Sequence, residues 1–289
     1  MIKYLTSKKN SQLLFTIILT TYNSENFINK AIKSIFKQKF KNFQLIIVDD
    51  GSTDNTLKII KNLKIKKKYK FKILNLPHSG SPARSRNVGI KKSRGKYICF
   101  LDCDDTFHKN KLDCLYKLIK INNSDVFYHN VYLKHEKKNL YCKIISEKTP
   151  FEDLIFNGNK ICLSSSCIKK NFLLKKKIKF NEKKNFFSVE DYDFWLQIAN
   201  NQGRFFLITK ILGTINNNEF SISKKRIVHF LNTIFLLKNY EKFFKKKKFK
   251  ITLRKFRIIT SFVKIAIFEK NLNFLFFIFK FLIKLRFIK

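Results

Sequence analysis

The chain has 289 residues, enough for one large or two modest domains, and 45% of them are hydrophobic, which is ample for a core. Its 61 Lys and Arg against 20 Asp and Glu give a formal net charge of +41, which favours anionic partners such as lipid surfaces, nucleic acid or phosphorylated substrates. Six cysteines without a CxxC pair, no apolar run of spanning length and no recognisable leader predict a reduced cytosolic protein, and they argue against a disulfide framework or a spanning helix.

Strand and helix patterns alternate through the first 130 residues. Continuous apolar runs predict strands, and apolar residues at three- and four-residue spacing predict helices. The predicted strands are 15–19, 43–49, 71–75 and 96–102, and the predicted helices are 24–38, 55–63 and 83–93. Because these strands are apolar throughout, we expect burial on both faces of a mostly parallel sheet flanked by helices, which is a doubly wound α/β fold.

The remaining sequence has a more mixed pattern. Residues 125–133 and 139–145 predict paired strands, and residues 189–202 predict a helix that begins with acidic side chains, as the helix dipole favours. Lys and Phe then dominate the last 70 residues, where "NLNFLFFIFKFLIKLRFIK" is the most apolar stretch. We therefore predict a folded domain over 1–220 and a basic, Phe-rich helical extension over 221–289.

Acidic residues, which are scarce in this chain, gather in three short motifs at element boundaries. The motifs are "IIVDDGSTDNT", "YICFLDCDD" and "VEDYDFW". Their acids are Asp49, Asp50 and Asp54; Asp102, Asp104 and Asp105; and Glu190, Asp191 and Asp193. In a doubly wound sheet the ligand lies beyond the carboxyl ends of the strands, so the first two motifs are expected to face one crevice.

Asp102 and Asp104 are two residues apart, so in an extended chain they point to the same side. Two converging carboxylates repel one another unless a cation joins them, and oxygen ligands favour Mg²⁺ or Mn²⁺ over Zn²⁺. Structural interpretations stay open for each motif by itself. "DDGS" is also typical of a strand–turn–helix corner, "DCDD" of a solvated loop and "EDYD" of a helix N-terminus.

Taken together, the motifs resemble those of family 2 glycosyltransferases with the GT-A fold. The resemblance extends from about Phe15 to Leu207, roughly two thirds of the chain. It rests on "TIILTTYNSENFINKAIKSIFKQ", "FQLIIVDDGSTDNT", "SGSPARSRNVGI", "GKYICFLDCDD" and "VEDYDFWLQIA", the first four in family order and spacing. The resemblance implies an inverting, metal-dependent, hexosyltransferase-like enzyme that moves a sugar from a nucleotide-sugar donor, most simply a UDP-sugar, to a hydroxyl acceptor.

The resemblance also implies roles for individual residues on the donor side. Thr20, Thr21 and Tyr22 would line the nucleotide pocket, with the Tyr22 ring against the base. Asp50 would accept a hydrogen bond from the base edge. Arg86 would lie near the diphosphate, and Arg84 is its rival because the loop is one residue longer than usual.

The metal and the acceptor side are implied in the same way. Asp102 would contact the ribose, Asp104 the divalent cation, and Asp105 would stand behind them. Asp191 would be the catalytic base. Asp49, next to Asp50, and Glu190, next to Asp191, are secondary candidate site residues. The segment "INNNEFSIS" departs from the family pattern, which often has Arg or His there, so diphosphate contacts from it are in doubt.

The implied acceptor is a glycan or a lipid-linked molecule of surface polysaccharide synthesis. Because the Phe-rich stretch is too short to span a bilayer, we expect the extension to lie at the membrane interface or to pack as a helical hairpin. The first alternative places the protein on the inner face of the cell membrane, bound to anionic lipid. Nucleic acid is not an expected partner.

Two other functions are compatible with parts of the sequence. "FLDCDDT" fits the DxDxT motif of a haloacid-dehalogenase-type phosphohydrolase, with Asp102 as nucleophile, although that motif normally stands near the start of its domain. The charge of +41 also fits a non-catalytic protein that binds nucleic acid or membrane. Acids clustered at strand ends disfavour this second function, because a pure phosphate-binding protein would avoid them.

Overall fold

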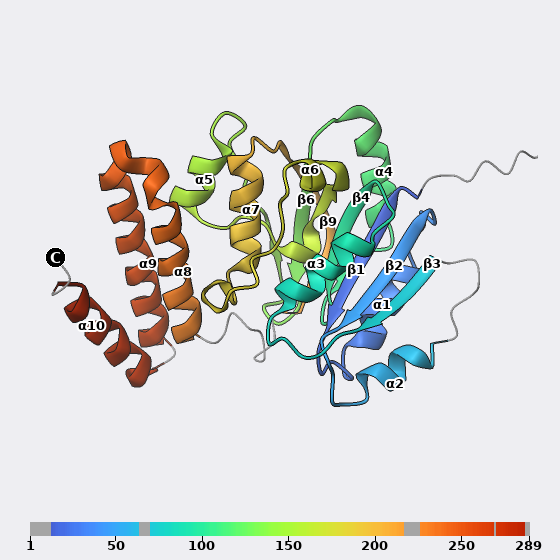
Figure 1. The fold of residues 1–289 in the computed structure, drawn as a ribbon, viewed down its shortest axis with the longest axis horizontal. Coiled ribbons are helices and arrows are strands. Elements are labelled where there is room, and N and C mark those ends of the chain that lie inside the picture. Colours follow the sequence, from blue (N-terminus) through green and yellow to red (C-terminus); the bar gives the residue numbers. More distant parts are fainter. Residues whose placement is uncertain (1–12, 64–69, 217–225, 269, 287–289) are drawn as a thin grey trace, which may run out of the picture. The chain divides into compact units, whose positions relative to one another are not determined.

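The computed structural model describes residues 13–63, 70–216, 226–268 and 270–286 (Figure 1). Contacts along the backbone divide the chain into two compact units, each assembled from segments that are separate in sequence. The first unit consists of residues 1–143, 161–177 and 204–216, and the second of residues 144–160, 178–203 and 217–289. The predicted domain boundary at residue 220 lies outside the described residues and stays a prediction.

One mixed sheet forms the centre of the first unit. Its described strands are β1 Phe15–Thr21, β2 Phe43–Asp49, β3 Lys70–Asn75, β4 Tyr97–Asp102, β5 Thr106–Phe107, β6 Val126–Leu133, β7 Lys138–Leu140, β8 Cys167–Lys169 and β9 Phe205–Ile215. Their spatial order is β3-β2-β1-β4-β8-β6-β9-β5, with β7 beside β6. The first four strands of this order are parallel, which confirms the α/β prediction, and β8 pairs antiparallel with both β4 and β6.

Helices cover both faces of the parallel half. The helices described in this unit are α1 Ile28–Phe36, α2 Thr56–Lys61, α3 Pro82–Lys92, α4 Lys111–Ile121, η1 Leu163–Ser165 and α6 Lys170–Lys175. Ile17 and Leu19 of β1 belong to the core that α1, α2 and α4 complete. Ile18 faces α3, and Gly89 lets that helix approach, because a Cβ on Gly89 would lie 2.5 Å from Ile18 Cγ2.

Two of the predicted strands differ from expectation. β3 is not buried on both faces: it is the edge strand next to β2, and its six residues are exposed or half-buried. Lysines on such an edge discourage pairing with another chain. The pairing of 125–133 with 139–145 is confirmed as β6 and β7, but β7 already ends at Leu140. Beyond it the Cys142 backbone N–H donates to the Asn130 side chain (2.8 Å) and leaves the strand ladder.

The second unit is helical in its described part. Its elements are α5 Pro150–Asn157, η2 Lys184–Phe186, α7 Glu190–Asn200, α8 Arg226–Tyr240, η4 Glu241–Lys247, α9 Lys248–Phe268 and α10 Leu272–Arg286. The predicted helix over 189–202 is confirmed as α7, and the helical extension as α8 to α10. The Tyr240 hydroxyl donates to Asp193 (2.8 Å) and ties α8 to α7, while Phe180 and Phe194 stack at 4.1 Å between ring centroids.

Candidate functional site

Three parallel strands end side by side at the carboxyl edge of the sheet. In the strand register Thr21 of β1 lies opposite Asp49 of β2, and Thr20 lies opposite Asp102 of β4. The two threonines are buried at the end of β1, the strand between the two acidic motifs. The structure therefore brings the first two acidic motifs to one edge, as the sequence predicted.

The turn after β2 accounts for Asp49. This fully buried carboxylate accepts hydrogen bonds from the backbone N–H (2.8 Å) and hydroxyl (2.5 Å) of Ser52. Gly51 has φ +76° and its Cβ would lie 2.7 Å from the His78 backbone nitrogen, so only glycine fits there. Asp49 thus builds the strand–turn–helix corner that the sequence left open as an alternative.

Asp50, the second acid of this motif, is buried among polar side chains near the exposed ring of Tyr22. It accepts hydrogen bonds from the backbone N–H (3.1 Å) and hydroxyl (2.8 Å) of Ser79, and His78 Nδ1 lies 3.1 Å from its second oxygen. The His78 ring in turn stacks on Tyr22, with 4.0 Å between centroids and 21° between planes. Sequence reasoning missed His78 and Ser79, although the polar stretch "HSGS" shortly after a predicted strand could have indicated them.

A buried arginine meets the acids at the end of β4. Arg86 of α3 is 5% exposed, and its Nη2 lies 3.0 Å from Asp102 Oδ1. Arg84 lies two residues earlier on the helix, half-buried, and makes no described contact with Asp102. Of the two rival arginines, Arg86 is therefore the one that the fold directs to the acidic motif.

Asp104 is a carboxyl group whose ionisation is suppressed. Burial and the negative charge of Asp102 raise the pKa of Asp104 to about 6. Cys103, which lies between them, contacts the Ser24 hydroxyl (2.9 Å). Burial and the nearby Asp104 charge raise the pKa of Cys103 to about 12, so it remains a thiol. The two aspartates repel each other in this geometry, as expected for a pair that a cation would stabilise.

Asp105 has a different environment from its neighbours in the motif. It is 5% exposed and accepts a hydrogen bond from the Asn216 backbone N–H (2.9 Å). Burial and the charges of Asp104 and Asp102 raise its pKa well above the usual range, and a hydrogen bond with Ser164 opposes that rise. Asp105 thereby anchors the end of β9 and the short helix η1, which is a structural role. In the sequence, Asn216 is the second residue of the segment "INNNEFSIS", which departs from the family pattern.

Few carboxylates at this edge of the sheet are placed to hold a metal ion. Within the described ranges, no group of three or more His, Cys, Asp or Glu side chains has the arrangement of a metal site. Asp102 and Asp104 alone match a Mg²⁺ or Mn²⁺ site in which phosphate oxygens and water complete the ligands. The residues present therefore fit a cation that binds together with a diphosphate.

Sequence reasoning also missed Lys111, a fully buried lysine beneath the acidic motif. Its Nζ donates to the Ser164 carbonyl (2.7 Å) and lies 3.7 Å from the centroid of the Phe107 ring. Burial lowers the pKa of Lys111 to about 8, and nearby Cys99, Cys167 and Asp105 oppose that shift. A lysine at the start of an amphipathic helix gave no indication of burial in the sequence.

This pKa predicts how stability depends on pH. Between pH 8 and 10.5 the folded chain loses the Lys111 proton while the unfolded chain keeps it, so rising pH favours folding. Relative to a Lys111→Met variant, the free energy of unfolding of the natural protein should therefore rise by at most about 1.4 kcal/mol per pH unit across this range. Urea unfolding of both proteins at pH 7.5, 9 and 10.5 measures the difference, and a constant difference would contradict the prediction.

The third acidic motif lies in the second unit, at the start of α7. Asp191 is half-buried; its Oδ2 accepts a hydrogen bond from Asn159 Nδ2 (3.1 Å), and its Oδ1 accepts one from the Tyr192 backbone N–H (2.7 Å). Glu190 is 5% exposed and therefore less accessible to a substrate. Trp195, one turn later, is fully buried and packs against Phe194.

The parallel half-sheet, with Arg86 and the paired aspartates at its carboxyl edge, has the arrangement typical of α/β proteins whose ligands bind at the strand ends. A sequence model described as "Glycosyl transferase family 2" matches residues 16–182. The chain therefore belongs to glycosyl transferase family 2 and is a glycosyltransferase. This result confirms the resemblance, and neither the phosphohydrolase nor the non-catalytic alternative gains support from it.

Several known proteins are similar to this chain. An uncharacterised glycosyltransferase of Haemophilus influenzae is 32% identical over 63% of this chain and 70% of its own length. A crystal structure of Staphylococcus aureus TarS 1-349 in complex with UDP-GlcNAc is 25% identical, with a TM-score of 0.61, over 78% of this chain and 66% of that one. The mannosyltransferase PcManGT of Pyrobaculum calidifontis, solved with GDP-Man and Mn²⁺, shares the fold (TM-score 0.62, 14% identity) over 87% of this chain and 74% of that one.

These structural likenesses confirm the predicted GT-A fold class with C-terminal helices. Other curated relatives are much longer than the matched segment. The alignment covers 50% of this chain but only 22% of an uncharacterised glycosyltransferase from Rickettsia conorii. The family thus defines the class of the chain.

Proposed function

We propose that the protein transfers a sugar, with inversion, from a nucleotide-sugar donor bound at the carboxyl edge of β1, β2 and β4 to a hydroxyl acceptor. The observation that carries this proposal is the pairing of Arg86 with Asp102 beside the electrostatically strained Asp104. The buried guanidinium of Arg86, next to the carboxylates of Asp102 and Asp104, suits a ligand that carries phosphate groups and a bound metal ion. A UDP-sugar is the favoured donor, because the TarS structure that this chain resembles holds UDP-GlcNAc.

On the nucleoside side, the stacked rings of Tyr22 and His78 offer an aromatic surface to a base. Tyr22 is 42% exposed, so its outer face is available for stacking. Asp50 already has contacts with Ser79, Ser85 and His78, and a donor from the base edge is proposed to take the place of the longest of them, the 3.4 Å contact with the Ser85 hydroxyl. Thr20 and Thr21 form the floor of the proposed pocket.

The diphosphate is proposed to lie against Arg86, Asp102 and a cation held by Asp104. When bound there, a divalent cation neutralises negative charge on the leaving nucleoside diphosphate. Arg86 supplies a second, permanent positive charge for the same purpose. Because Arg86 is buried and its guanidinium already points to the acidic motif, this charge needs little reorganisation.

On the acceptor side, Asp191 is proposed to take the proton from the attacking hydroxyl. Asn159 holds one carboxylate oxygen of Asp191 and so orients the side chain. Attack on the anomeric carbon from the side opposite the leaving group inverts its configuration. The acceptor is proposed to be a glycan or a lipid-linked intermediate in the synthesis of a surface polysaccharide.

A ligand screen tests this proposal. UDP-, GDP-, dTDP- and CMP-sugars are each added to the protein with and without Mn²⁺, and the midpoint of thermal unfolding is measured. A true donor stabilises the folded state by mass action, and its effect should depend on Mn²⁺. A panel that leaves the midpoint unchanged, with and without the metal, would refute the proposed donor site.

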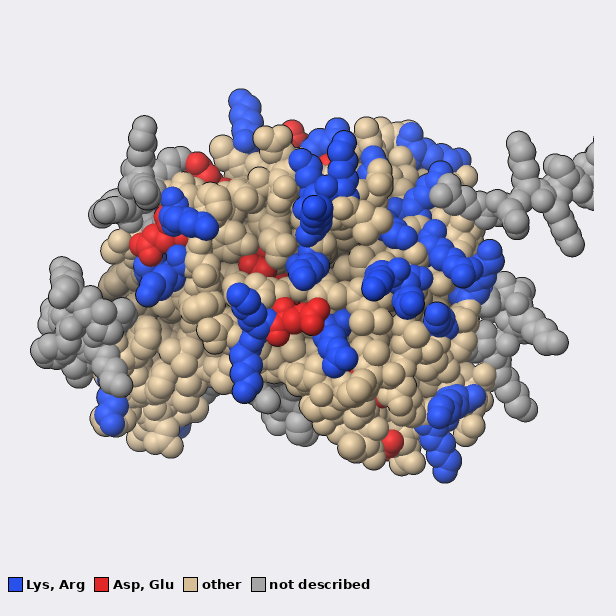
Figure 2. All heavy atoms as spheres, in the orientation of Figure 1, with Lys and Arg blue, Asp and Glu red and all other residues tan. Residues whose placement is uncertain are grey.

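The C-terminal helices are proposed to hold the protein on an anionic membrane surface. No helix among the described residues is long and apolar enough to cross a membrane. Lys and Arg side chains are scattered over the face drawn in Figure 2, and Asp and Glu form only a few small groups there. Exposed side chains at the junction of α9 and α10 form a surface that we call the apolar ridge: Phe268, Leu272, Phe276 and Phe279.

The helix α10 has features of both predicted arrangements, the packed helical hairpin and the helix at the membrane interface. Phe274 and Ile278 of α10 are buried, so this helix packs as a hairpin would. Phe268, however, is 90% exposed, and Phe276 is 61% exposed, with Lys280 Nζ 4.8 Å from the centroid of its ring. Exposed Phe flanked by Lys suits insertion into a lipid interface, where the lysines reach the headgroups.

We expect a Phe276→Ser/Phe279→Ser variant to lose sedimentation with anionic liposomes, because both side chains belong to the exposed face of α10. The natural protein should sediment with liposomes that contain phosphatidylglycerol, and less with neutral ones. Ile121→Ser removes an apolar side chain that is 83% exposed in the first unit, and it serves as the control. Sedimentation of the double variant equal to that of the control would contradict membrane attachment through the apolar ridge.

A further inference from the structure

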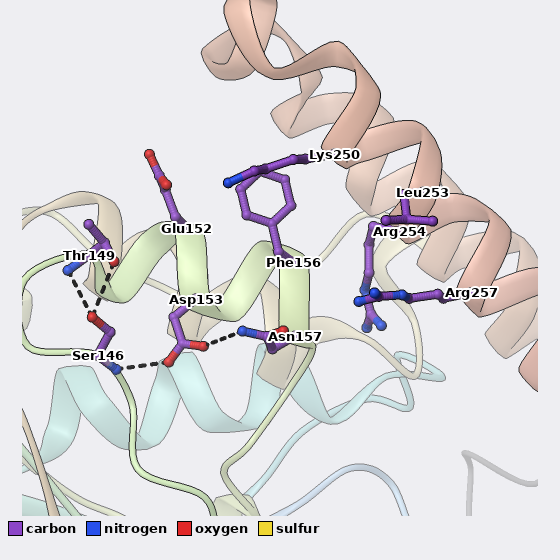
Figure 3. A pocket seen from close by; sticks show the side chains of 10 residues that line it. All are labelled: Ser146, Thr149, Glu152, Asp153, Phe156, Asn157, Lys250, Leu253, Arg254 and Arg257. Carbon is purple, nitrogen blue, oxygen red and sulfur yellow. Dashed lines mark hydrogen bonds between the residues drawn. The ribbon is translucent and has the colours of Figure 1, made fainter.

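A cavity of about 470 Å³ lies within the second unit, between α5 and α9 (Figure 3). Polar and charged side chains make up most of its wall, and Phe156 and Leu253 supply the apolar part. Its volume suffices for a group larger than a single ion.

Three positive charges from one face of α9 line this cavity. Lys250, Arg254 and Arg257 are spaced four and three residues apart, so they project from the same side of the helix. Figure 3 shows both arginines reaching from α9 toward the C-terminal end of α5. In the described part of the chain no carboxylate forms an ion pair with either arginine, and the buried Nε of Arg254 has no hydrogen-bond partner.

The acidic residues in the wall do not cancel these charges. Asp153 is paired with Lys160 at 2.6 Å and accepts hydrogen bonds from Asn157 Nδ2 (2.7 Å) and the Ser146 backbone N–H (2.8 Å). Glu152 points away from the two arginines in Figure 3. A net positive charge therefore remains on the α9 side of the cavity, with an unfilled donor at Arg254.

The cavity adjoins the proposed catalytic base within the same unit. Asn157 lines the cavity, a Cβ on Gly158 would lie 2.5 Å from Arg254 Nη2, and Asn159 donates to Asp191. A second connection runs through Tyr192, whose hydroxyl donates to the Leu154 carbonyl of α5 (2.6 Å). Burial raises the pKa of Tyr192 to about 12, and the positive charge of Arg254 and its hydrogen bond with the Tyr192 side chain oppose this rise.

From this arrangement we infer that the cavity binds a phosphate group of the acceptor substrate, with Arg254 and Arg257 as its main ligands and Lys250 at the rim. Guanidinium groups match phosphate oxygens in paired hydrogen bonds, which the unfilled Nε of Arg254 can complete. The acceptor hydroxyl would then extend toward Asp191, whose partner Asn159 is two residues from Asn157 in the cavity wall. The inference rests on the proposed function and assigns its acceptor to the phosphorylated class.

Binding of inorganic phosphate to the full chain tests the cavity without any turnover. The midpoint of thermal unfolding is measured against phosphate concentration at constant ionic strength, which gives an apparent dissociation constant. We expect Arg254→Gln/Arg257→Gln to weaken phosphate binding about tenfold or more, because two charge-assisted contacts are lost. The control variant Lys91→Gln/Lys92→Gln removes two exposed charges from α3. It should change the apparent dissociation constant for phosphate by less than about twofold.

The matched variants separate this site from the others. Arg257 is exposed, so Arg257→Gln alone keeps the test valid if the double variant fails to fold. Loss of phosphate binding in Arg86→Gln but not in the double variant would assign the phosphate to the donor site and overturn the inference. Binding of phosphatidylglycerol vesicles that depends on the two arginines, without binding of free phosphate, would make the cavity a lipid site and overturn it too.

Acceptor kinetics complete the test. With the donor from the ligand screen, the double variant should raise the KM for a phosphorylated sugar acceptor about tenfold and leave both the donor KM and the KM for the dephosphorylated acceptor unchanged. Equal effects on the two acceptors would overturn the inference. Binding of nucleoside diphosphate with Mn²⁺ is measured on the same variants; its absence from the natural protein would refute the proposed donor site without affecting the phosphate result.

Discussion

An Asp191→Asn variant is expected to lose turnover by about 10²–10⁴ and to keep its affinity for the donor. The amide has almost the same shape as the carboxylate and can still interact with Asn159, but it cannot accept the acceptor proton. The measurement is single-turnover sugar transfer from a labelled donor, with donor affinity determined separately by titration. A reduced rate at unchanged affinity is the signature of a group that acts on the acceptor.

Glu190→Gln is the matched control for this experiment. Glu190 directly precedes Asp191 on α7 but is 5% exposed, so its replacement should affect folding stability more than the chemical step. A Glu190→Gln enzyme without activity beside a normally active Asp191→Asn enzyme would reverse the assignment within the acidic pair.

An Asp104→Ala variant should lose the part of nucleoside diphosphate binding that depends on a divalent cation. Asp104 lies in the turn after β4 and not within a strand, so the fold should persist. Removing it leaves Asp102 as a single carboxylate, which Arg86 already neutralises. Titration calorimetry with nucleoside diphosphate, with and without Mn²⁺, measures the effect, and identical Mn²⁺-dependent affinity in the variant would contradict the metal assignment.

Two neighbouring acids serve as controls for Asp104→Ala. Asp113→Ala removes a partly exposed carboxylate of α4 whose ion pair is with Lys117 (3.1 Å), and it should bind the diphosphate normally. Asp105→Ala should instead lower the free energy of unfolding by about 1–3 kcal/mol, because the buried Asn216 backbone N–H loses its acceptor. The three variants together distinguish metal binding from the structural role of this motif.

The sequence by itself determined the class of the protein and the positions of its acidic motifs at the ends of strands and the start of a helix. Apolar strands followed by acids, in the order of the three motifs, led to the family and the GT-A fold, and the strand register brings Asp49 and Asp102 to one edge. This was possible because a strand's length and burial, and the position of polar residues at its end, are local properties of the chain. The helix α7, with its acidic first turn, was predictable for the same reason.

Only the tertiary structure shows how the individual members of each motif are buried and hydrogen-bonded. Asp49 is fully buried and held by Ser52, and Asp105 is buried against the Asn216 backbone, whereas Asp104 lies in the turn after β4 beside the charge of Asp102. The choice of Arg86 over Arg84 depends on which side of α3 faces β4. The cationic cavity depends on α5 and α9, which are nearly 100 residues apart in sequence. Such contacts arise from the packing of distant segments, and no local pattern of residues specifies them.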